Sequence, residues 1–151
     1  MDELDRKILD AAQRGFPLAA DPYALLAERV GSDAETVFGR AMALLDDGTL
    51  RRLGAVWDSR RLGFATTLVA LRVPPERVAD VAALVNRCDE VTHNYERRSE
   101  WNLWFTLVAR DAARIDEILA EVRRDAGIRE ADMMNLPAEQ VYKLDARFAA
   151  R

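Results

Sequence analysis

The spacing of apolar residues changes once along this chain, near Thr66, and that change constrains the fold more than any other feature. Before it, apolar residues recur at the spacing of a helix face; after it, alternating and β-branched stretches are separated by further helical ones. A segment patterned for one period cannot bury its apolar face at the other period. The sequence therefore predicts an α+β chain in two parts.

The first part is predicted to hold three short helices. Residues 2–14, and the stretch that follows Asp21-Pro22, each place apolar residues on one face. A third helix is expected from Ser32 to about Asp46, with Ser32 and Glu35 as a capping box at its start. A tight turn before a third helix is typical of a helix-turn-helix, and residues 49–58 then suit the hairpin of a winged version.

The second part is predicted to follow the order β-α-β-β-α-β, which is the ferredoxin-like arrangement. The expected elements are a strand at Thr66–Val73, a helix at 76–88, strands at Val91–Arg98 and Trp101–Ala109, a helix at 111–124, and extended segments at Ala131–Leu136 and around Val141–Leu144. We therefore expect a winged helix-turn-helix domain at residues 1–63 and a ferredoxin-like domain at residues 64–151.

Composition argues against several classes of protein. A net charge of −4 opposes a general nucleic-acid binder, which carries a basic face. No apolar run approaches the roughly 20 residues of a membrane span. One histidine and one cysteine are too few for a structural zinc site of the usual Cys/His kind. Cys88 cannot form an internal disulfide and lies on the apolar side of a predicted helix, so we expect a core thiol in a cytoplasmic protein.

Charge is divided unevenly along the chain. Residues 1–50 carry ten acidic and five basic side chains, whereas residues 51–110 carry ten basic and seven acidic ones. The third predicted helix begins with Asp33 and Glu35 and has Arg40 as its only base. Phosphate contacts supply much of the affinity of such modules for DNA, so we predict that this one does not bind it. The clustered arginines suit a small, flat polyanion better than a duplex.

The only histidine lies in a predicted strand beside groups that can bind an anion. Alternation places Val91, His93, Tyr95 and Arg97 on one face of that strand. Histidine can move protons near neutral pH and arginine can hold a carboxylate, so the set suits acid–base work on an anionic substrate. A histidine that is merely satisfied by hydrogen bonds at a sheet interface is an equally good interpretation from residue types alone.

Two further stretches hold candidate ligand contacts. On the strand that follows, Asn102 and Trp104 occupy the more polar face. The stretch between the two predicted domains places a tryptophan between arginine pairs, and its candidates are Arg51, Arg52, Trp57, Ser59, Arg60 and Arg61. A solvated linker is the alternative. However, a linker gains little from a tryptophan, whereas an aromatic plate between arginines suits a flat ring with carboxylates.

With these residues the chain resembles the sirohaem decarboxylases, relatives of the Lrp/AsnC transcription regulators that act in haem and haem d1 formation. The matching stretches are Leu4–Leu9, Gly15–Leu18, Arg51–Gly63, Val91–Tyr95 and Asn102–Thr106. The first is shared with ordinary Lrp-type regulators, and the resemblance covers nearly the whole chain. It implies a winged helix followed by a ferredoxin-like ligand-binding domain of the Lrp/AsnC type.

The resemblance also implies an activity, that of a carboxy-lyase made of this chain and a paralogous partner subunit, as a heterodimer or a higher assembly. Such an enzyme removes carbon dioxide from the acetate side chains on C12 and C18 of sirohaem and leaves 12,18-didecarboxysirohaem. It needs no cofactor beyond the iron of the substrate. The tetrapyrrole is implied to lie in the ferredoxin-like part, at a subunit interface.

The resemblance implies a role for His93, and the chemistry of sirohaem suggests roles for the other residues. His93 is implied to donate a proton or to contact the substrate iron, and Tyr95 would orient it. Arg97 and the four arginines at positions 51, 52, 60 and 61 would clamp carboxylates, while Trp57 and Trp104 would line the ring. Ser59, Asn94 and Asn102 complete the predicted substrate-binding set. Sirohaem is flat and carries carboxylates around its rim, so it needs arginines and aromatic plates.

Two other functions remain open from the sequence. An Lrp/AsnC-type regulator would bind DNA and a small effector such as an amino acid, although the acidic third helix speaks against it. A non-catalytic haem or tetrapyrrole-binding protein would show the same binding residues as an enzyme. Family members also divide into two subunit types, so this chain could supply one wall of the pocket while its partner holds more of the catalytic groups.

Overall fold

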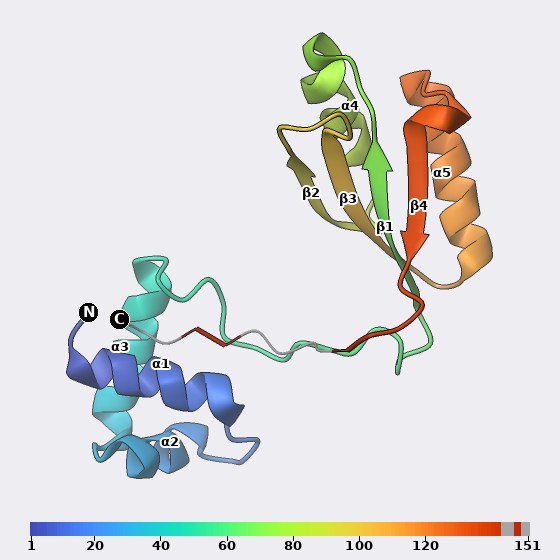
Figure 1. The fold of residues 1–151 in the computed structure, drawn as a ribbon. Helices are drawn as coiled ribbons and strands as arrows, with labels where there is room; N and C mark the ends of the chain where they lie inside the picture. The colour runs from blue at the N-terminus through green and yellow to red at the C-terminus, as the bar shows by residue number, and fades with distance from the viewer. Residues whose placement is uncertain (143–146, 149–151) are drawn as a thin grey trace. The chain divides into compact units, whose positions relative to one another are not determined.

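The structure, a computed structural model, describes residues 1–142 and 147–148, which form two compact units (Figure 1). The first unit comprises Met1–Ala55 together with Arg147 and Phe148, and the second comprises Val56–Tyr142. The predicted domain boundary at residues 63 and 64 stays a prediction, and in the structure Phe148 groups with the helices of the first unit. The side-chain amide of Gln13 holds it there: its Oε1 accepts from the N–H of Phe148 at 2.8 Å, and its Nε2 donates to the Phe148 carbonyl at 2.9 Å.

The first unit is the predicted helix-turn-helix. It consists of α1 (Glu3–Gly15), α2 (Pro22–Val30) and α3 (Ala34–Asp46), and Gly31 makes the turn between α2 and α3 with a left-handed φ of 73°. The apolar face of each helix turns inward, because none is stable in water without burial. The buried residues of this small core are Ile8, Leu26, Ala27 and Val37.

Two local predictions for this unit were wrong. The cap of α3 is Asp33 rather than Ser32, and its carboxylate accepts the N–H of Thr36 at 2.8 Å. Among residues 49–58, all of which are described, no strand forms, so the expected wing hairpin is missing. The Leu50 N–H instead donates to the Leu44 carbonyl at 2.7 Å and closes the end of α3. A hairpin needs a second alternating stretch to pair with, and this charged segment offers none.

The second unit confirms the predicted β-α-β-β-α-β order. Its elements are β1 (Ala65–Leu71), a short 3₁₀ turn at Pro75–Arg77, α4 (Val78–Val85), β2 (Val91–Glu96), β3 (Leu103–Ala109), α5 (Ala112–Ala126), a second 3₁₀ turn at Glu130–Asp132 and β4 (Met133–Pro137). The strands form one antiparallel sheet in the order β2-β3-β1-β4. Of the last extended segment predicted, Val141 and Tyr142 form no strand, and residues 143 and 144 lie outside the described residues.

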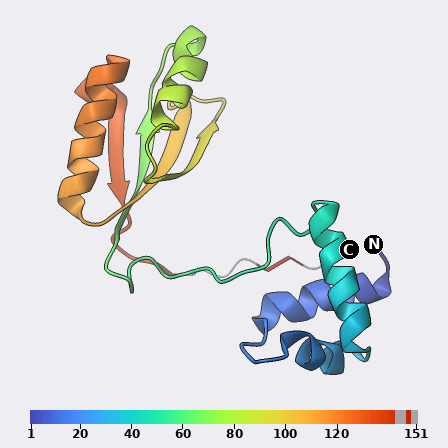
Figure 2. The same ribbon diagram turned by 180° about the vertical axis from the view of Figure 1, so that it is seen from behind.

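Helices α4 and α5 pack against the same face of this sheet and build a single core with it (Figures 1 and 2). The strands supply Val69, Leu71 and Phe105 to that core, and the helices supply Val81 and Ile118, all of them fully buried. No helix of this unit covers the other face, which we call the open face. No helix in the described part of the chain is sufficiently long and apolar to cross a bilayer.

Two glycines of the helix-turn-helix should respond in opposite ways to alanine. Gly31→Ala places a Cβ at a left-handed φ and should lower the free energy of unfolding by about 1 kcal/mol. Gly39 lies inside α3, where an added Cβ meets nothing within 4 Å, so Gly39→Ala should raise it by about 0.5–1 kcal/mol. Urea unfolding followed by far-ultraviolet circular dichroism measures both, and equal shifts would contradict the assigned turn.

Candidate functional site

The open face carries His93 because β2 contains one extra residue. Val91 lies opposite Leu107, but His93 lies opposite Thr106, so Thr92 is the additional residue of a β-bulge. Val91 therefore packs against the core, while His93 points to the open face with Thr106. The prediction that Val91 shares a face with His93 was wrong, since simple alternation does not allow for a bulge.

Beside His93, the open face holds an arginine between two aromatic rings. Tyr95 lies opposite Trp104 in the sheet, so their rings share this face. The guanidinium carbon of Arg97 lies 5.1 Å from the Tyr95 ring centroid and 4.7 Å from the Trp104 ring centroid. Arg97 also donates a hydrogen bond to the Tyr95 hydroxyl at 3.2 Å. The structure therefore brings Tyr95, Arg97 and Trp104, three members of the predicted set, together on one face of the sheet.

His93 itself is exposed and lightly held. Its Nδ1 lies 3.1 Å from the hydroxyl of Thr92, and no other hydrogen bond joins its ring to a described residue. The Tyr95 hydroxyl is bonded to Arg97, so the expected contact through which Tyr95 would orient His93 is absent. An exposed imidazole with a free ring nitrogen can exchange protons with a bound ligand.

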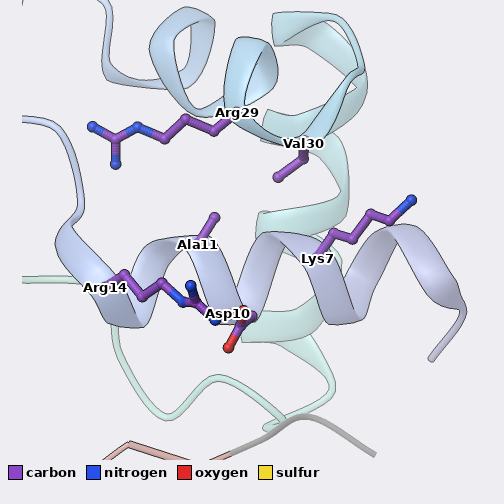
Figure 3. A pocket seen from close by; sticks show the side chains of 6 residues that line it. All are labelled: Lys7, Asp10, Ala11, Arg14, Arg29 and Val30. Atoms are coloured by element: carbon purple, nitrogen blue, oxygen red, sulfur yellow. Dashed lines mark ion pairs between the residues drawn. The ribbon is translucent and has the colours of Figure 1, made fainter.

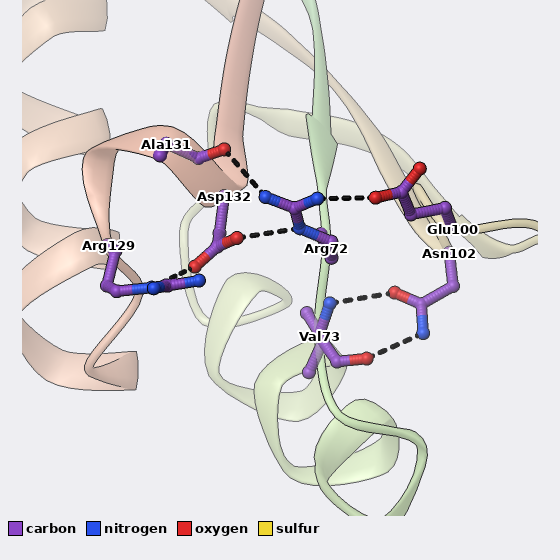
Figure 4. Close-up of polar contacts among 7 residues, drawn as sticks. All are labelled: Arg72, Val73, Glu100, Asn102, Arg129, Ala131 and Asp132. Atoms are coloured by element: carbon purple, nitrogen blue, oxygen red, sulfur yellow. Dashed lines mark hydrogen bonds and ion pairs between the residues drawn. The ribbon is translucent and has the colours of Figure 1, made fainter.

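The two asparagines of the predicted set lie apart from this cluster. Asn94 faces the helices, where its amide donates to the Ala82 carbonyl at 3.1 Å and to the side chain of Asn86 at 2.9 Å. Asn102 binds the backbone of Val73 through both ends of its amide, at 2.9 and 2.7 Å (Figure 4). The side chain of Asn102 thus joins the end of β1 to the start of β3.

The predicted residues of the interdomain stretch divide between the two units. Trp57, with 74% of its surface exposed, and Ser59, Arg60 and Arg61 belong to the second unit. Asp58 lies 4.0 Å from Nε of Arg60 and 3.8 Å from Nε of Arg61, so it partly neutralises both arginines. Arg51 and Arg52 belong to the first unit, where both are exposed.

A network of ion pairs braces the turn that carries Arg97 (Figure 4). Arg72, which follows β1, binds both Glu100 in the β2–β3 turn and Asp132 before β4. Arg129 pairs with the other oxygen of Asp132, and these two arginines hold the pKa of the Asp132 carboxyl below its usual value, with Arg129 the larger cause. Nothing in the apolar pattern of the sequence indicates this network of ion pairs.

A second ion pair fixes the start of β2. Nε of Arg114 in α5 donates to the carboxylate of Glu90 at 2.9 Å, and the Cys88 thiol donates to the same carboxylate at 3.1 Å. These hydrogen bonds, chiefly that of Arg114, lower the pKa of Glu90 to about 2. Burial is the main cause that raises the pKa of the Cys88 thiol. The thiol is half-buried against the core, as predicted.

The first unit has a pocket of different character. It lies between α1 and α2, has a volume of about 290 Å³, and is lined by Lys7, Asp10, Ala11, Arg14, Arg29 and Val30 (Figure 3). Arg14 pairs with Asp10 at 2.8 Å, and Arg29 donates to the carbonyl of Gly15 at 2.6 Å. This pocket has no aromatic wall, and its one carboxylate, that of Asp10, is paired with Arg14, so it is a poorer candidate than the open face.

Comparison with known proteins places the chain in a family. A model of the AsnC-like ligand binding domain matches residues 61–143, and a model of the "Siroheme decarboxylase NirDL-like HTH domain" matches residues 5–51. The "Siroheme decarboxylase NirG subunit" of Stutzerimonas stutzeri is 43% identical over 98% of this chain and 99% of its own length. The chain belongs to the sirohaem decarboxylase family.

Two further relatives of this sirohaem decarboxylase family member are informative. The "Siroheme decarboxylase NirD subunit" of Pseudomonas aeruginosa is 42% identical over 98% of this chain and 96% of its own. The crystal structure of the siroheme decarboxylase NirDL in complex with an iron-uroporphyrin III analogue superposes with a TM-score of 0.75 at 28% identity. That match covers 97% of this chain but 48% of the NirDL chain, so the present chain spans about half of NirDL.

Replacing Asn102 tests whether its side chain stabilises the junction between β1 and β3. Asn102→Ala removes the partners of two backbone groups at Val73, which is 3% exposed, so it should lower the free energy of unfolding by about 1–3 kcal/mol. Arg98→Ala, an exposed change in the same turn, should stay within about 0.5 kcal/mol of wild type. Urea unfolding compares the two, and an Asn102→Ala protein as stable as wild type would contradict this bracing role.

Proposed function

We propose that this chain is a sirohaem decarboxylase subunit that converts sirohaem to 12,18-didecarboxysirohaem together with a paralogous partner chain. Similarity to the NirG and NirD subunits along the whole chain carries the proposal. The open face supports it, because it offers an imidazole, a phenol, a guanidinium and an indole side by side. Flat tetrapyrroles with rim carboxylates require such rings and arginines.

The proposed chemistry is a decarboxylation completed by a proton. The bond between the acetate methylene carbon and its carboxyl carbon breaks, carbon dioxide leaves, and the electron pair stays on the methylene carbon, conjugated with the ring. A proton then completes the methyl group. We assign the delivery of this proton to His93. Its Nδ1 contacts the Thr92 hydroxyl, and its other ring nitrogen, Nε2, has no hydrogen-bond partner among the described residues. No cofactor beyond the substrate and its iron is invoked.

The remaining members of the predicted set are proposed as carboxylate and ring contacts. Arg97 holds a rim carboxylate on the open face. A second rim carboxylate suits the turn that holds Trp57, Arg60 and Arg61, which are exposed, and Ser59, which is half-buried. Asp58 must first release the two arginines with which it is paired. The proposal for Arg51 and Arg52 rests on the sequence motif alone.

Removal of His93 tests the assignment. Anaerobic incubation of the chain, its partner and sirohaem should release carbon dioxide, and the product mass should be lower than that of sirohaem by two molecules of carbon dioxide. His93→Ala should lower kcat by about 100-fold or more while binding of sirohaem changes little. Glu96→Gln, an exposed change on the same strand, is the matched control and should keep wild-type turnover.

The outcomes separate the proposed enzyme from a carrier. Wild-type protein that binds sirohaem but releases no carbon dioxide, with or without the partner, would show a binding protein instead. Undiminished turnover by His93→Ala would remove the proton-transfer role and leave the enzyme assignment standing. In heavy water, the new methyl groups should each carry one solvent deuteron.

We also propose that the helix-turn-helix does not bind DNA. The start of α3 presents the carboxylates of Asp33 and Glu35, and its exposed side carries Phe38 and Met42. The single base of the helix, Arg40, is already paired with Asp2 at 2.9 Å and with Asp5 at 3.5 Å. A gel-shift titration with duplex DNA at low salt should show no complex, because phosphate contacts are what such a face lacks. Retardation that weakens steeply with added salt would contradict this and favour a regulator.

A further inference from the structure

We infer that Tyr95 and Trp104 are positioning residues that hold Arg97 as a preformed clamp for one rim carboxylate of the ligand. The inference rests on the proposed function for the identity of that ligand. It changes the part played by Trp104, which acts through Arg97 and not as a wall against the tetrapyrrole ring.

The backbone of Arg97 is fixed before its side chain is considered. Its N–H donates to the Asn102 carbonyl at 2.8 Å, and its carbonyl accepts the N–H of Ser99 at 3.0 Å. Arg97 therefore sits in a closed turn directly after β2, which ends at Glu96. From that position the guanidinium reaches back over the open face and stacks between the two rings, at 5.1 and 4.7 Å.

The rings are themselves held in place. The indole N–H of Trp104 donates to the Trp101 carbonyl at 2.6 Å, which fixes the ring plane against the turn. The ring of Trp101 in turn carries the guanidinium of Arg72, at 5.3 Å. On the other side, the Tyr95 hydroxyl accepts the hydrogen bond from Arg97. Two rings and one hydroxyl thus restrict a side chain that would otherwise rotate freely in water.

The guanidinium of Arg97 is held in position by aromatic rings and not by a carboxylate. Glu100 is the carboxylate of the same turn, and Arg72 binds it. Within the described part of the chain, Arg97 forms no ion pair, whereas Arg72 and Arg114 each bind at least two carboxylates. Aromatic faces attract a guanidinium but leave most of its N–H groups unbonded. The remaining fork can therefore accept a carboxylate in the bidentate way.

A double-mutant cycle distinguishes a positioning role from a direct contact. The variants are Trp104→Leu, Arg97→Ala and the double variant, and the probe is iron uroporphyrin III, titrated by its absorbance. We expect each single change to raise Kd about tenfold and the double change to add little, because Trp104 acts through Arg97. Trp104→Phe, which keeps an aromatic face, should stay within about threefold of wild type.

Two milder variants guard against loss of folding. Tyr95→Phe keeps the ring and removes only the hydroxyl, so Kd should rise by about twofold to fivefold. Arg97→Lys keeps the charge but loses the planar fork, so it should bind nearly as weakly as Arg97→Ala. Circular dichroism and thermal unfolding are recorded for every variant. Equal binding by wild type and Arg97→Lys would overturn the clamp.

Other outcomes separate this inference from the proposed function. Additive losses in the cycle, or Trp104→Phe as weak as Trp104→Leu, would overturn the positioning role even if wild-type protein decarboxylates sirohaem. Non-additive losses in a protein that never releases carbon dioxide would support the clamp and overturn the enzyme assignment.

Discussion

Burial of one face of the sheet against α4 and α5 is the constraint on which the rest of the second unit depends. Val69, Phe105 and their neighbours must face the helices, because exposing them would forfeit most of the apolar burial that stabilises this unit. The strand residues that alternate with these core residues then point to the open face, where they can contact a ligand or a partner. The bulge at Thr92 adjusts β2 to the same constraint: Val91 enters the core, and His93 reaches the open face.

Arginines in this unit serve two different purposes, and their partners distinguish them. Arg72 and Arg114 join elements that are distant in the sequence, and each forms ion pairs with neighbouring carboxylates. Arg97 instead stacks on aromatic rings and forms no ion pair with a described residue. The two purposes are linked, because Arg72 occupies Glu100, the acidic neighbour that shares a turn with Arg97.

In the helix-turn-helix, the residues that make the fold and the residues that face outward are different sets. The three helices, the left-handed turn at Gly31 and the buried core are what packing requires of any such unit. A DNA-binding surface requires free bases on the exposed side of α3 as well, and there the chain has acids, apolar side chains and one arginine, Arg40, that is paired with Asp2 and Asp5. The fold therefore says little about function by itself, and the exposed residues say more.

The sequence by itself determined the order and type of nearly every element, because the spacing of apolar residues is a local pattern and each element buries the face that this pattern makes apolar. It also indicated Tyr95, Arg97 and Trp104, since residue type and strand alternation suffice to place them together. Only the tertiary structure decided the bulge at Thr92, the missing wing and the bracing by Asn102. The bulge and the bracing depend on partners distant in the sequence, Leu107 for Val91 and Val73 for Asn102, whereas the wing is missing because residues 49–58 offer no second stretch to pair with. No local pattern records such a partner, because hydrogen bonds and register are settled only when the strands meet.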